Sequence, residues 1–568
     1  MPQSYRHNLP PVREASSQQE MDGITDVRED HPYSRDQEKD NVNQPWSRRS
    51  SIVAYMCILI VVYVCSLQQQ ISASLLTHIM SSFGQHPFIA FSGMLQSIFG
   101  TVCTLPLAKV INNREYTMAC IWAFAWTITG LVLTATSKSV SAFIVHQMSC
   151  WCGYYGIFYI LDVMIADMSS LEHRALLLAF ARAPYIMNAF VAPNIAQLIY
   201  QHNTWRWAYG SFAILLFLAF IALLIFLSSQ GTRTARVKDR ADETNIPTLS
   251  HNFKIFLLQF DVVGLFLLAM VIPALLIPFG GEKDRTISEK VVSVAVGGVF
   301  LLAFGIWETV HAPFQLVPLG LLLRSTVLGV CLAGLILFTN FYCLNTYFMS
   351  YLQVVYNFSI PEAGFIHNIY VTGACFTAIL TGVLIRATGK FKLLAIIAMV
   401  WHFIATGLIL HFRRPNNIPA TLIVLFQALV SISGGVLGIC GQIAIMAATP
   451  DSNVAAVLSL LSLFTGLGAA IGQVVASAIY THSMPRALSK YLPADTRPWA
   501  KHIYGSITQQ LSYPMTSPVR QAIIQSYSEC MRYMCLAALC VLPISLLSVM
   551  MWKNIGVGNA KRAQVEAI

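Results

Sequence analysis

Long apolar stretches dominate this chain and constrain its fold more than any other feature. About fourteen of them, each near 20 residues, follow one another from Ser51 to Trp552, and no soluble domain separates them. A bilayer core roughly 30 Å thick requires about 20 apolar residues per spanning helix. The sequence therefore predicts an all-α, polytopic membrane protein with about 14 transmembrane helices.

The composition agrees with a chain that lies mostly in a membrane. Of the 568 residues, 56% are hydrophobic and 11% are charged, whereas a soluble domain carries about 25% charged residues. The net charge of +10 is explained by short basic loops on one side of the membrane, so we expect no binding to nucleic acid. The 13 cysteines are scattered, without the spacing of metal ligands, and we expect no metal site and no cofactor.

Changes in polarity divide the chain into segments. Residues 1–50 are polar and mixed in charge, which predicts a disordered cytoplasmic tail. The following segments are a six-helix half (51–229), a basic cytoplasmic linker (230–257), two inserted helices (258–308), a second six-helix half (309–554) and a cytoplasmic tail (555–568). Two parallel halves plus an inserted pair are typical of a major facilitator fold with fourteen spans.

Loop charges predict the orientation. An even number of spans puts both termini on one side, and the excess of Lys and Arg in the predicted inner loops assigns that side to the cytoplasm. Some outer loops depart from this rule, at Lys283, Arg285, Lys290, Arg413 and Arg414. A large extracellular loop is expected at 481–530, and its aromatic residues favour an ordered loop.

Asp162 is the strongest candidate for a transport residue. It lies inside the predicted fourth span between apolar neighbours, where a carboxylate is costly unless it is paired, protonated or facing a cavity. Burial favours the protonated carboxyl group, which suits a proton carrier near neutral pH. A satisfied polar contact near the inner end of the span explains the residue equally well, because Asp167 follows closely.

A charged turn connects the fourth and fifth spans. In one interpretation, Asp167 and Arg174 pair across this turn and separate when the halves move. In the other, Ser169 and Glu172 form a capping box and the charges anchor the start of the helix. Arg182, early in the fifth span, either extends to the inner interface or faces the cavity opposite a negative group.

Polar and aromatic residues gather near the outer mouth of the second half. Tyrosine rings present both an apolar face and a hydroxyl group to a bulky polar solute, although an interfacial aromatic belt is the alternative. The candidate substrate-binding residues are Tyr347, Tyr351, Gln353, Asn368 and Tyr370, with Tyr491 and Tyr504 from the outer loop.

From about Ser51 to Asn554 the chain resembles the fungal siderophore–iron transporters of the major facilitator superfamily. The resemblance rests on five motifs that occur in order. They are IADMSSLEHR at 165–174, WRWAYG at 205–210, QFDVVG at 259–264, YLQVVY at 351–356 and GFIHNIY at 364–370. The outer segment containing 520–527 resembles the large terminal loop of that family.

The resemblance implies proton-coupled import of ferric siderophores, which are hydroxamate-type iron chelates, by alternating access. It implies Asp162 as a proton site, and the outer loop with the 351–370 region as the place of substrate entry. The iron would stay on the siderophore. The expected partners are the ferric siderophore, protons and the lipid bilayer, and we expect a monomer in the cell membrane, with a vacuolar or vesicular membrane as the alternative.

One departure from the family pattern lies in the turn after the second span. The family usually has an Asp and a Gly before the Arg of this turn, whereas Asn112 and Asn113 precede Arg114 here. The inner gate would then rely on Asp167 and Arg174 together with the basic turn of the second half at 386–392, or the transport cycle is altered.

Two other functions compete with import. A multidrug/proton antiporter would export small organic molecules, but the fifth helix of those proteins is rich in glycine and proline, and 183–194 contains no glycine. A non-transporting nutrient sensor would explain the altered turn, but such sensors have long cytoplasmic extensions, and the chain after Trp552 is short. Enzyme function is not expected, because the residues form no nucleophile–base or metal constellation.

Overall fold

A computed structural model describes residues 48–112, 116–202, 205–238, 261–280, 286–312, 315–412 and 419–556. Within these ranges, 14 helices are long and apolar enough to cross a membrane, which confirms the predicted all-α, fourteen-span fold. Several expectations lie outside the described residues: the tail at 1–47, the turn at 113–115, the linker at 239–257, the outer-loop charges at Lys283, Arg285, Arg413 and Arg414, and the end at 557–568.

The first six spans include two interrupted helices. Proline begins α8, and a proline ring clashes with the carbonyl of the preceding turn, so the fifth span breaks at Arg182 and Ala183. The last helix of the first half begins at Trp205 and continues to Lys238, into the predicted linker. The helices are α2 (Arg48–Ser82), α3 (Ile89–Val102) with α4 (Thr104–Asn112), α5 (Tyr116–Ala135), α6 (Val140–Met168), α7 (Leu171–Ala181) with α8 (Pro184–Gln201), and α9 (Trp205–Lys238).

The inserted pair lies at the edge of the bundle. It consists of α11 (Val262–Gly280) and α12 (Ile287–Ile306), which ends in the π-helical turn η2 (Trp307–His311). α11 packs against α3 and α19 (Val454–Tyr491), and α12 packs against α11. Only 17% of the apolar window of α12 is buried inside the protein, so most of its surface is available to lipid.

The QFDVVG motif connects the two ends of this pair. Asp261 Oδ1 accepts hydrogen bonds from the Gly264 amide (3.1 Å) and from Trp307 Nε1 (2.8 Å). A Cβ atom at position 264 would lie 2.4 Å from Asp261 Oδ2. Glycine at this position therefore leaves space for the carboxylate, which joins the start of α11 to the end of α12.

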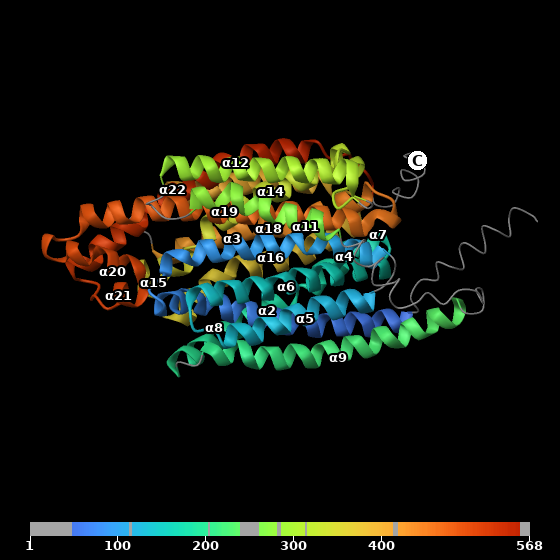
Figure 1. The fold of residues 1–568 in the computed structure, drawn as a ribbon, viewed down its shortest axis with the longest axis horizontal. Helices are drawn as coiled ribbons and strands as arrows, with labels where there is room; N and C mark the ends of the chain where they lie inside the picture. Colours follow the sequence, from blue (N-terminus) through green and yellow to red (C-terminus); the bar gives the residue numbers. More distant parts are fainter. Residues whose placement is uncertain are drawn as a thin grey trace, which may run out of the picture. The chain divides into compact units, whose positions relative to one another are not determined.

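The second half contains the remaining six spans. They are α14 (Ser325–Asn345) with α15 (Phe348–Tyr356), α16 (Ile360–Thr388), α17 (Lys392–Phe412), α18 (Ala420–Ala447), α19 and α22 (Pro518–Met550), preceded by the short α13 (Leu319–Leu322). The two halves meet along two lines of contact: α16 packs along α7 and α8, and α19 packs along α3 and α4. These long helices run side by side (Figure 1).

The expectation of a long outer loop at 481–530 is wrong for most of that segment. α19 continues to Tyr491 and α22 begins at Pro518. Between them, the outer cap (residues 492–517) contains η4 (Ala494–Trp499), α20 (Ala500–Gly505) and α21 (Ile507–Leu511), at one end of the bundle (Figure 1). Met484 and Cys530 are buried where the two long helices pack together. The drop in hydropathy thus marks the end of the apolar core, not the end of the helices.

We call the end of the bundle with the outer cap the outer end, and the end with Arg48 and Trp552 the inner end. These names follow the predicted orientation, which stays a prediction.

Candidate functional site

A cavity of about 530 Å³, the central cavity, lies between the two halves. The first half contributes residues of α2, α6, α7 and α8, and the second half residues of α14, α16, α17, α18 and α19. Trp552 lines it at the inner end. The wall is mainly apolar and aromatic, and its polar groups include Gln69, Tyr154, Asp162, Arg182, Tyr185, Tyr370 and Gln442. A large apolar cavity with a few polar groups is typical of a small-molecule site.

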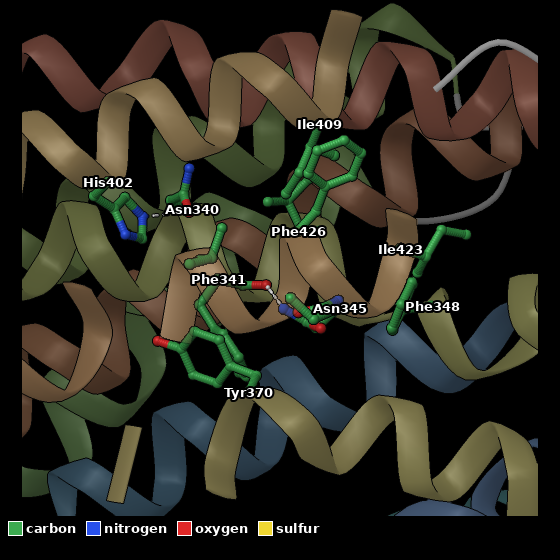
Figure 2. A pocket seen from close by; sticks show the side chains of 12 residues that line it. Asn340, Phe341, Asn345, Phe348, Tyr370, His402, Ile409, Ile423 and Phe426 are labelled. Atoms are coloured by element: carbon green, nitrogen blue, oxygen red, sulfur yellow. Dashed lines mark hydrogen bonds between the residues drawn. The ribbon is translucent and has the colours of Figure 1, made fainter. Parts of the chain in front are cut away.

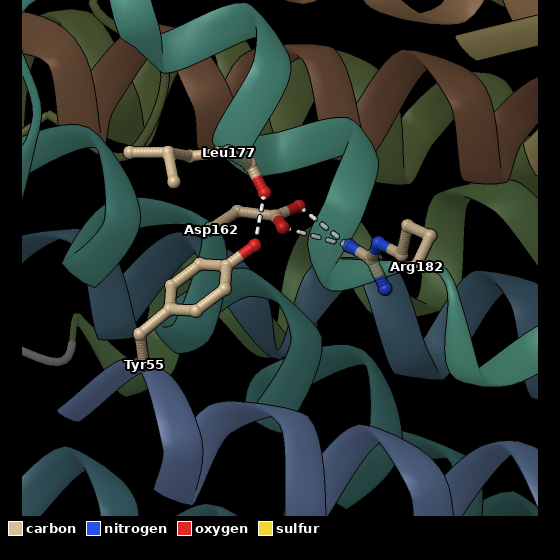
Figure 3. Close-up of polar contacts among 4 residues, drawn as sticks. All are labelled: Tyr55, Asp162, Leu177 and Arg182. Atoms are coloured by element: carbon tan, nitrogen blue, oxygen red, sulfur yellow. Dashed lines mark hydrogen bonds and ion pairs between the residues drawn. The ribbon is translucent and has the colours of Figure 1, made fainter. Parts of the chain in front are cut away.

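Asp162 and Arg182 form an ion pair in the wall of this cavity (Figure 3). Arg182 Nη2 lies 2.8 Å from Oδ1 and 2.8 Å from Oδ2 of Asp162. The break between α7 and α8 places the arginine opposite α6. Its guanidinium group also lies over the ring of Phe158, 4.6 Å from the ring centre. Of the two interpretations of Arg182, the structure supports the one in which it lines the cavity and pairs with a negative group.

The position of α7 is set by a contact with the first span. The Tyr55 hydroxyl of α2 donates a hydrogen bond of 2.7 Å to the Leu177 carbonyl oxygen, one turn before the break (Figure 3). Because Arg182 follows directly after α7, this contact also positions the guanidinium group.

The ion pair is the main electrostatic feature of the cavity. The side chains of Arg182 and Asp162 are only 28% and 17% exposed, so each charge has lost most of its hydration. Removing one partner of a buried pair leaves an uncompensated charge and costs about 3–5 kcal/mol. Protonation of Asp162 would release Arg182, whose guanidinium group then becomes available to an oxygen-rich ligand.

The inner turn differs from the expected capping box. The Ser169 hydroxyl donates back to the Ile165 carbonyl oxygen, and Ser170 is the N-cap of α7 without a side-chain bond to the helix. The capping-box prediction is therefore wrong. Tyr116 donates a hydrogen bond to Asp167, and Arg174 Nη2 donates to the Ser169 carbonyl oxygen at 3.1 Å. That Asp167 and Arg174 pair and then separate when the halves move stays a prediction.

The predicted substrate cluster is divided by the structure. Tyr370 lines the central cavity, whereas Tyr347, Tyr351, Gln353 and Asn368 are at most 4% exposed and pack at the outer end. Tyr347, Gln353 and Asn368 form a closure with the first half, and Tyr351 is buried on the same helix as Gln353. We call this closure the outer seal.

Hydrogen bonds across the outer seal join the two halves. The Tyr347 hydroxyl donates to the Pro87 carbonyl oxygen (2.8 Å), and Gln353 Oε1 lies 2.9 Å from His78 Nε2. Asn368 Nδ2 donates to Gln70 Oε1 at 3.3 Å. In this conformation, these residues close the outer end and make no contact with the cavity. Their role in substrate binding stays a prediction.

The two loop tyrosines occupy different positions. Tyr504 stacks on Tyr480, with 5.6 Å between ring centres, and Tyr480 stacks on Tyr347 at 4.1 Å. Burial of Tyr504 raises the pKa of its hydroxyl group by desolvation. Tyr491, at the end of α19, donates to Glu529 at 3.3 Å. Tyr504 thus extends the aromatic stack of the outer seal, whereas Tyr491 bonds the last helix, α22.

Sequence reasoning missed two polar side chains, one that bonds the backbone of the outer seal and one in the central cavity. Arg520 is completely buried, and it donates to the carbonyl oxygens of Val354 (3.1 Å), Gln510 (2.5 Å) and Gln353 (3.4 Å). It lay in a segment interpreted as a loop. Gln69 lines the cavity and accepts a hydrogen bond of 2.8 Å from Tyr185. The run of three glutamines at 68–70 inside an apolar span was the available signal.

Comparison with known proteins identifies the family. The model of the Major Facilitator Superfamily matches residues 56–400 and 330–489. The chain belongs to this superfamily. MFS siderochrome iron transporter 1 of Ajellomyces capsulatus is 35% identical, over 92% of this chain and 89% of that protein. MFS siderochrome iron transporter D of Aspergillus fumigatus is 32% identical, over 90% of this chain and 86% of that protein.

A solved structure supports the same fold. A bacterial homolog of the human lysosomal transporter Spinster, in an inward-facing and unoccupied conformation, covers 89% of this chain and 98% of its own. The TM-score is 0.53 at 13% sequence identity. Together with the family membership, this likeness confirms the predicted major facilitator fold. The predictions of a multi-pass membrane protein and of a transporter, not an enzyme, are confirmed as well.

Potential metal ligands do not cluster in the part of the chain that the structure describes. There, no group of three or more His, Cys, Asp or Glu side chains lies close enough to hold a metal ion.

Proposed function

We propose that the protein imports ferric siderophores of the hydroxamate type together with protons, by alternating access. The siderochrome iron transporters that match about nine-tenths of the chain support the substrate class. The observation that carries the coupling mechanism is the ion pair of Asp162 and Arg182 in the cavity wall.

The chemistry of the central cavity suits such a substrate. Three hydroxamates neutralise one ferric ion, so the chelate is a compact, uncharged body with oxygen atoms on its surface. A cavity of about 530 Å³ lies within the range of about 300–1,000 Å³ that is usual for ligand sites. Aromatic rings would contact the apolar faces of the chelate, and Arg182 would donate to its oxygen atoms.

Coupling follows from the competition for Arg182. When the cavity faces outward, a proton binds Asp162 and the neutral carboxyl group releases the guanidinium group to the chelate. When the cavity faces inward, loss of that proton restores the ion pair, which displaces the chelate. The cycle moves both species in the same direction, because the chelate binds well only while Asp162 is protonated.

The outer seal fits the inward-facing state of this cycle. It is closed by buried side chains, whereas the central cavity extends to Trp552 at the inner end. Import therefore requires the seal to open, with the halves moving about their two lines of contact. We further propose that the transporter acts as a monomer in the plasma membrane.

Uptake of radioactive iron tests this function. The protein would be expressed in cells that lack their own siderophore transporters, and several ferric hydroxamates would be supplied with and without a protonophore. We expect accumulation of at least one chelate, which the protonophore abolishes. If no chelate accumulates although the protein reaches the cell surface, the proposal of import is wrong. Export or ligand sensing then becomes the better explanation of the function.

A further inference from the structure

A second, smaller cavity lies inside the second half (Figure 2). This side cavity has a volume of about 30 Å³ and is lined by α14, α16, α17 and α18. A water molecule needs about 10–15 Å³ of such space and several polar partners, so the side cavity has room for about two. Its polar lining residues are Asn340, Asn345, Tyr370, His402 and Gln427.

The side cavity lies between the outer part of the bundle and the central cavity. Ile423 lies in the first turn of α18, and Asn345 ends α14, so both mark the outer end. His402 lies halfway along α17, at the opposite end of the side cavity from Ile423 (Figure 2). Phe341, Tyr370 and His402 line both cavities. The imidazole is therefore part of the wall between them.

The hydrogen-bond partners of His402 are fixed by their own contacts. Its Nε2 lies 3.1 Å from Asn340 Oδ1, and Asn340 Nδ2 donates to the Ala538 carbonyl oxygen at 3.0 Å. That second bond orients the amide so that its oxygen faces the imidazole. Asn340 is therefore an acceptor toward His402.

Ser433 lies within hydrogen-bond distance of the other ring nitrogen of His402. Its Oγ lies 2.6 Å from His402 Nδ1 and 2.8 Å from the Val430 carbonyl oxygen, to which the hydroxyl donates. In this arrangement both ring nitrogens face oxygen acceptors. A neutral imidazole has a single N–H, whereas the imidazolium has two, so only the charged form satisfies both partners.

One rotation would adapt the site to the neutral form. If the Ser433 hydroxyl turns from Val430 toward Nδ1, the neutral ring accepts from Ser433 and donates from Nε2 to Asn340. The two states thus differ by one proton and one hydroxyl rotation. His402 is only 3% exposed, and burial disfavours the imidazolium, whereas the two acceptors favour it. These opposing effects suit a group that gains and loses a proton.

We propose that His402 is a second proton-binding residue of the transport cycle, and that it receives its proton through the side cavity and releases it toward the central cavity. The proposal rests on the proton-coupled import argued above. The titratable or charged groups that face His402 are Tyr370 of α16 and, across the central cavity, Asp162 and Arg182. α14 and α18 contribute the uncharged Asn340 and Ser433, and α22 contributes the Ala538 carbonyl behind Asn340.

The test uses the full-length protein in liposomes and a radio-iron-loaded trihydroxamate. Accumulation under an imposed pH gradient requires proton coupling, whereas counterflow exchange between equal pH values does not. For His402→Gln we expect accumulation to fall by about tenfold or more, while counterflow stays within about twofold of the wild type. Wild-type accumulation by this variant would overturn the proposal.

A control separates this effect from the loss of any histidine that bonds a serine. His146 Nδ1 also bonds a serine, Ser137 Oγ, at 2.8 Å, on the fourth span and outside the lining of either cavity. His146→Gln should leave accumulation and counterflow unchanged.

A second variant and a direct observation cover the case in which His402→Gln does not fold. Ser433→Ala keeps the imidazole but removes one acceptor, and should reduce accumulation about fivefold with counterflow retained. In solid-state nitrogen NMR, the wild-type spectrum minus that of Ser433→Ala should contain an imidazolium signal at low pH that gives way to neutral signals as the pH rises. Absence of this signal at every pH overturns the proposal. If the wild type accumulates no chelate, the proposed function is wrong. The NMR titration still shows in that case whether His402 binds and releases a proton.

Discussion

The outer seal and the central cavity have similar compositions but opposite structures. Both combine tyrosine rings with polar side chains, yet Tyr347 and Tyr480 stack at 4.1 Å in the seal, whereas about 530 Å³ stays open around Asp162 and Arg182. In the seal, polar groups of one half bond the other half. In the cavity, an ion pair is held within the first half, and the second half faces it across open space. Pairing between the halves, not composition, therefore distinguishes the closed seal from the open cavity.

The two regions also differ in the strength of their interactions. A neutral hydrogen bond contributes about 0.5–1.5 kcal/mol net, so contacts such as that of Gln353 with His78 can break and form again in each cycle. The buried ion pair is costlier to separate, and its separation requires a proton or a ligand. The seal is thus suited to movement, and the cavity to coupling.

The largest effect is expected from Asp162→Asn. The amide has a similar shape but does not ionise, so proton-driven accumulation of a ferric hydroxamate should fall about a hundredfold, while binding to the purified protein stays largely intact. Accumulation and equilibrium binding of the same radio-iron chelate measure this. Asp495→Asn, at an exposed position of the outer cap, is the control. Wild-type uptake by Asp162→Asn would contradict the assignment.

The next effect concerns stability of the ion pair. Arg182→Gln leaves the Asp162 carboxylate without its partner and should destabilise the protein by about 3–5 kcal/mol. Adding Asp162→Asn removes the buried charge, and the double variant should recover most of the loss. Thermal melting of the purified variants at one pH tests this. A double variant less stable than Arg182→Gln would show that the charge is not the cause.

Much of the fold was predictable because its signals are local. Each span is a continuous apolar run, and Asp162 is an isolated carboxylate inside one of them. The partner of Asp162 depends on the helix break before Pro184, which turns Arg182 toward α6. Whether Gln353 or Tyr370 faces open space depends on how the two halves fit together. The sequence names these residues but carries no local signal for that fit.

A third experiment disturbs the seal and not the cavity. Arg520→Ala removes charged donors from three carbonyl oxygens, and bonds of this kind contribute about 1.5–3 kcal/mol each. The seal should open more often. We expect labelling of Ala90→Cys, a buried position at the outer end, by an impermeant thiol reagent to accelerate about tenfold. Lys501→Ala, which removes an exposed charge of the outer cap, should not change the rate. An equal rate in Arg520→Ala would mean that this arginine does not hold the seal.

The smallest effects compare two tyrosines from the same predicted cluster. Tyr370→Ala removes a ring from the cavity wall and should raise the KM for the chelate about fivefold, since one aromatic contact contributes about 0.5–1.5 kcal/mol. Tyr491→Phe removes one hydrogen bond between α19 and α22 and should change the KM less than about twofold. Concentration-dependent uptake measures both. A larger effect at Tyr491 would place substrate recognition at the outer end and reverse the comparison.

The most direct measurement of the coupling is the proton movement caused by the substrate itself. Wild-type protein and Asp162→Asn would be sealed in liposomes with a pH-sensitive dye inside, at equal pH on both sides, and a ferric trihydroxamate would be added outside. The account predicts that the interior acidifies with the wild type and stays constant with Asp162→Asn. Entry of the chelate without acidification in the wild type, or equal acidification in the variant, would contradict it.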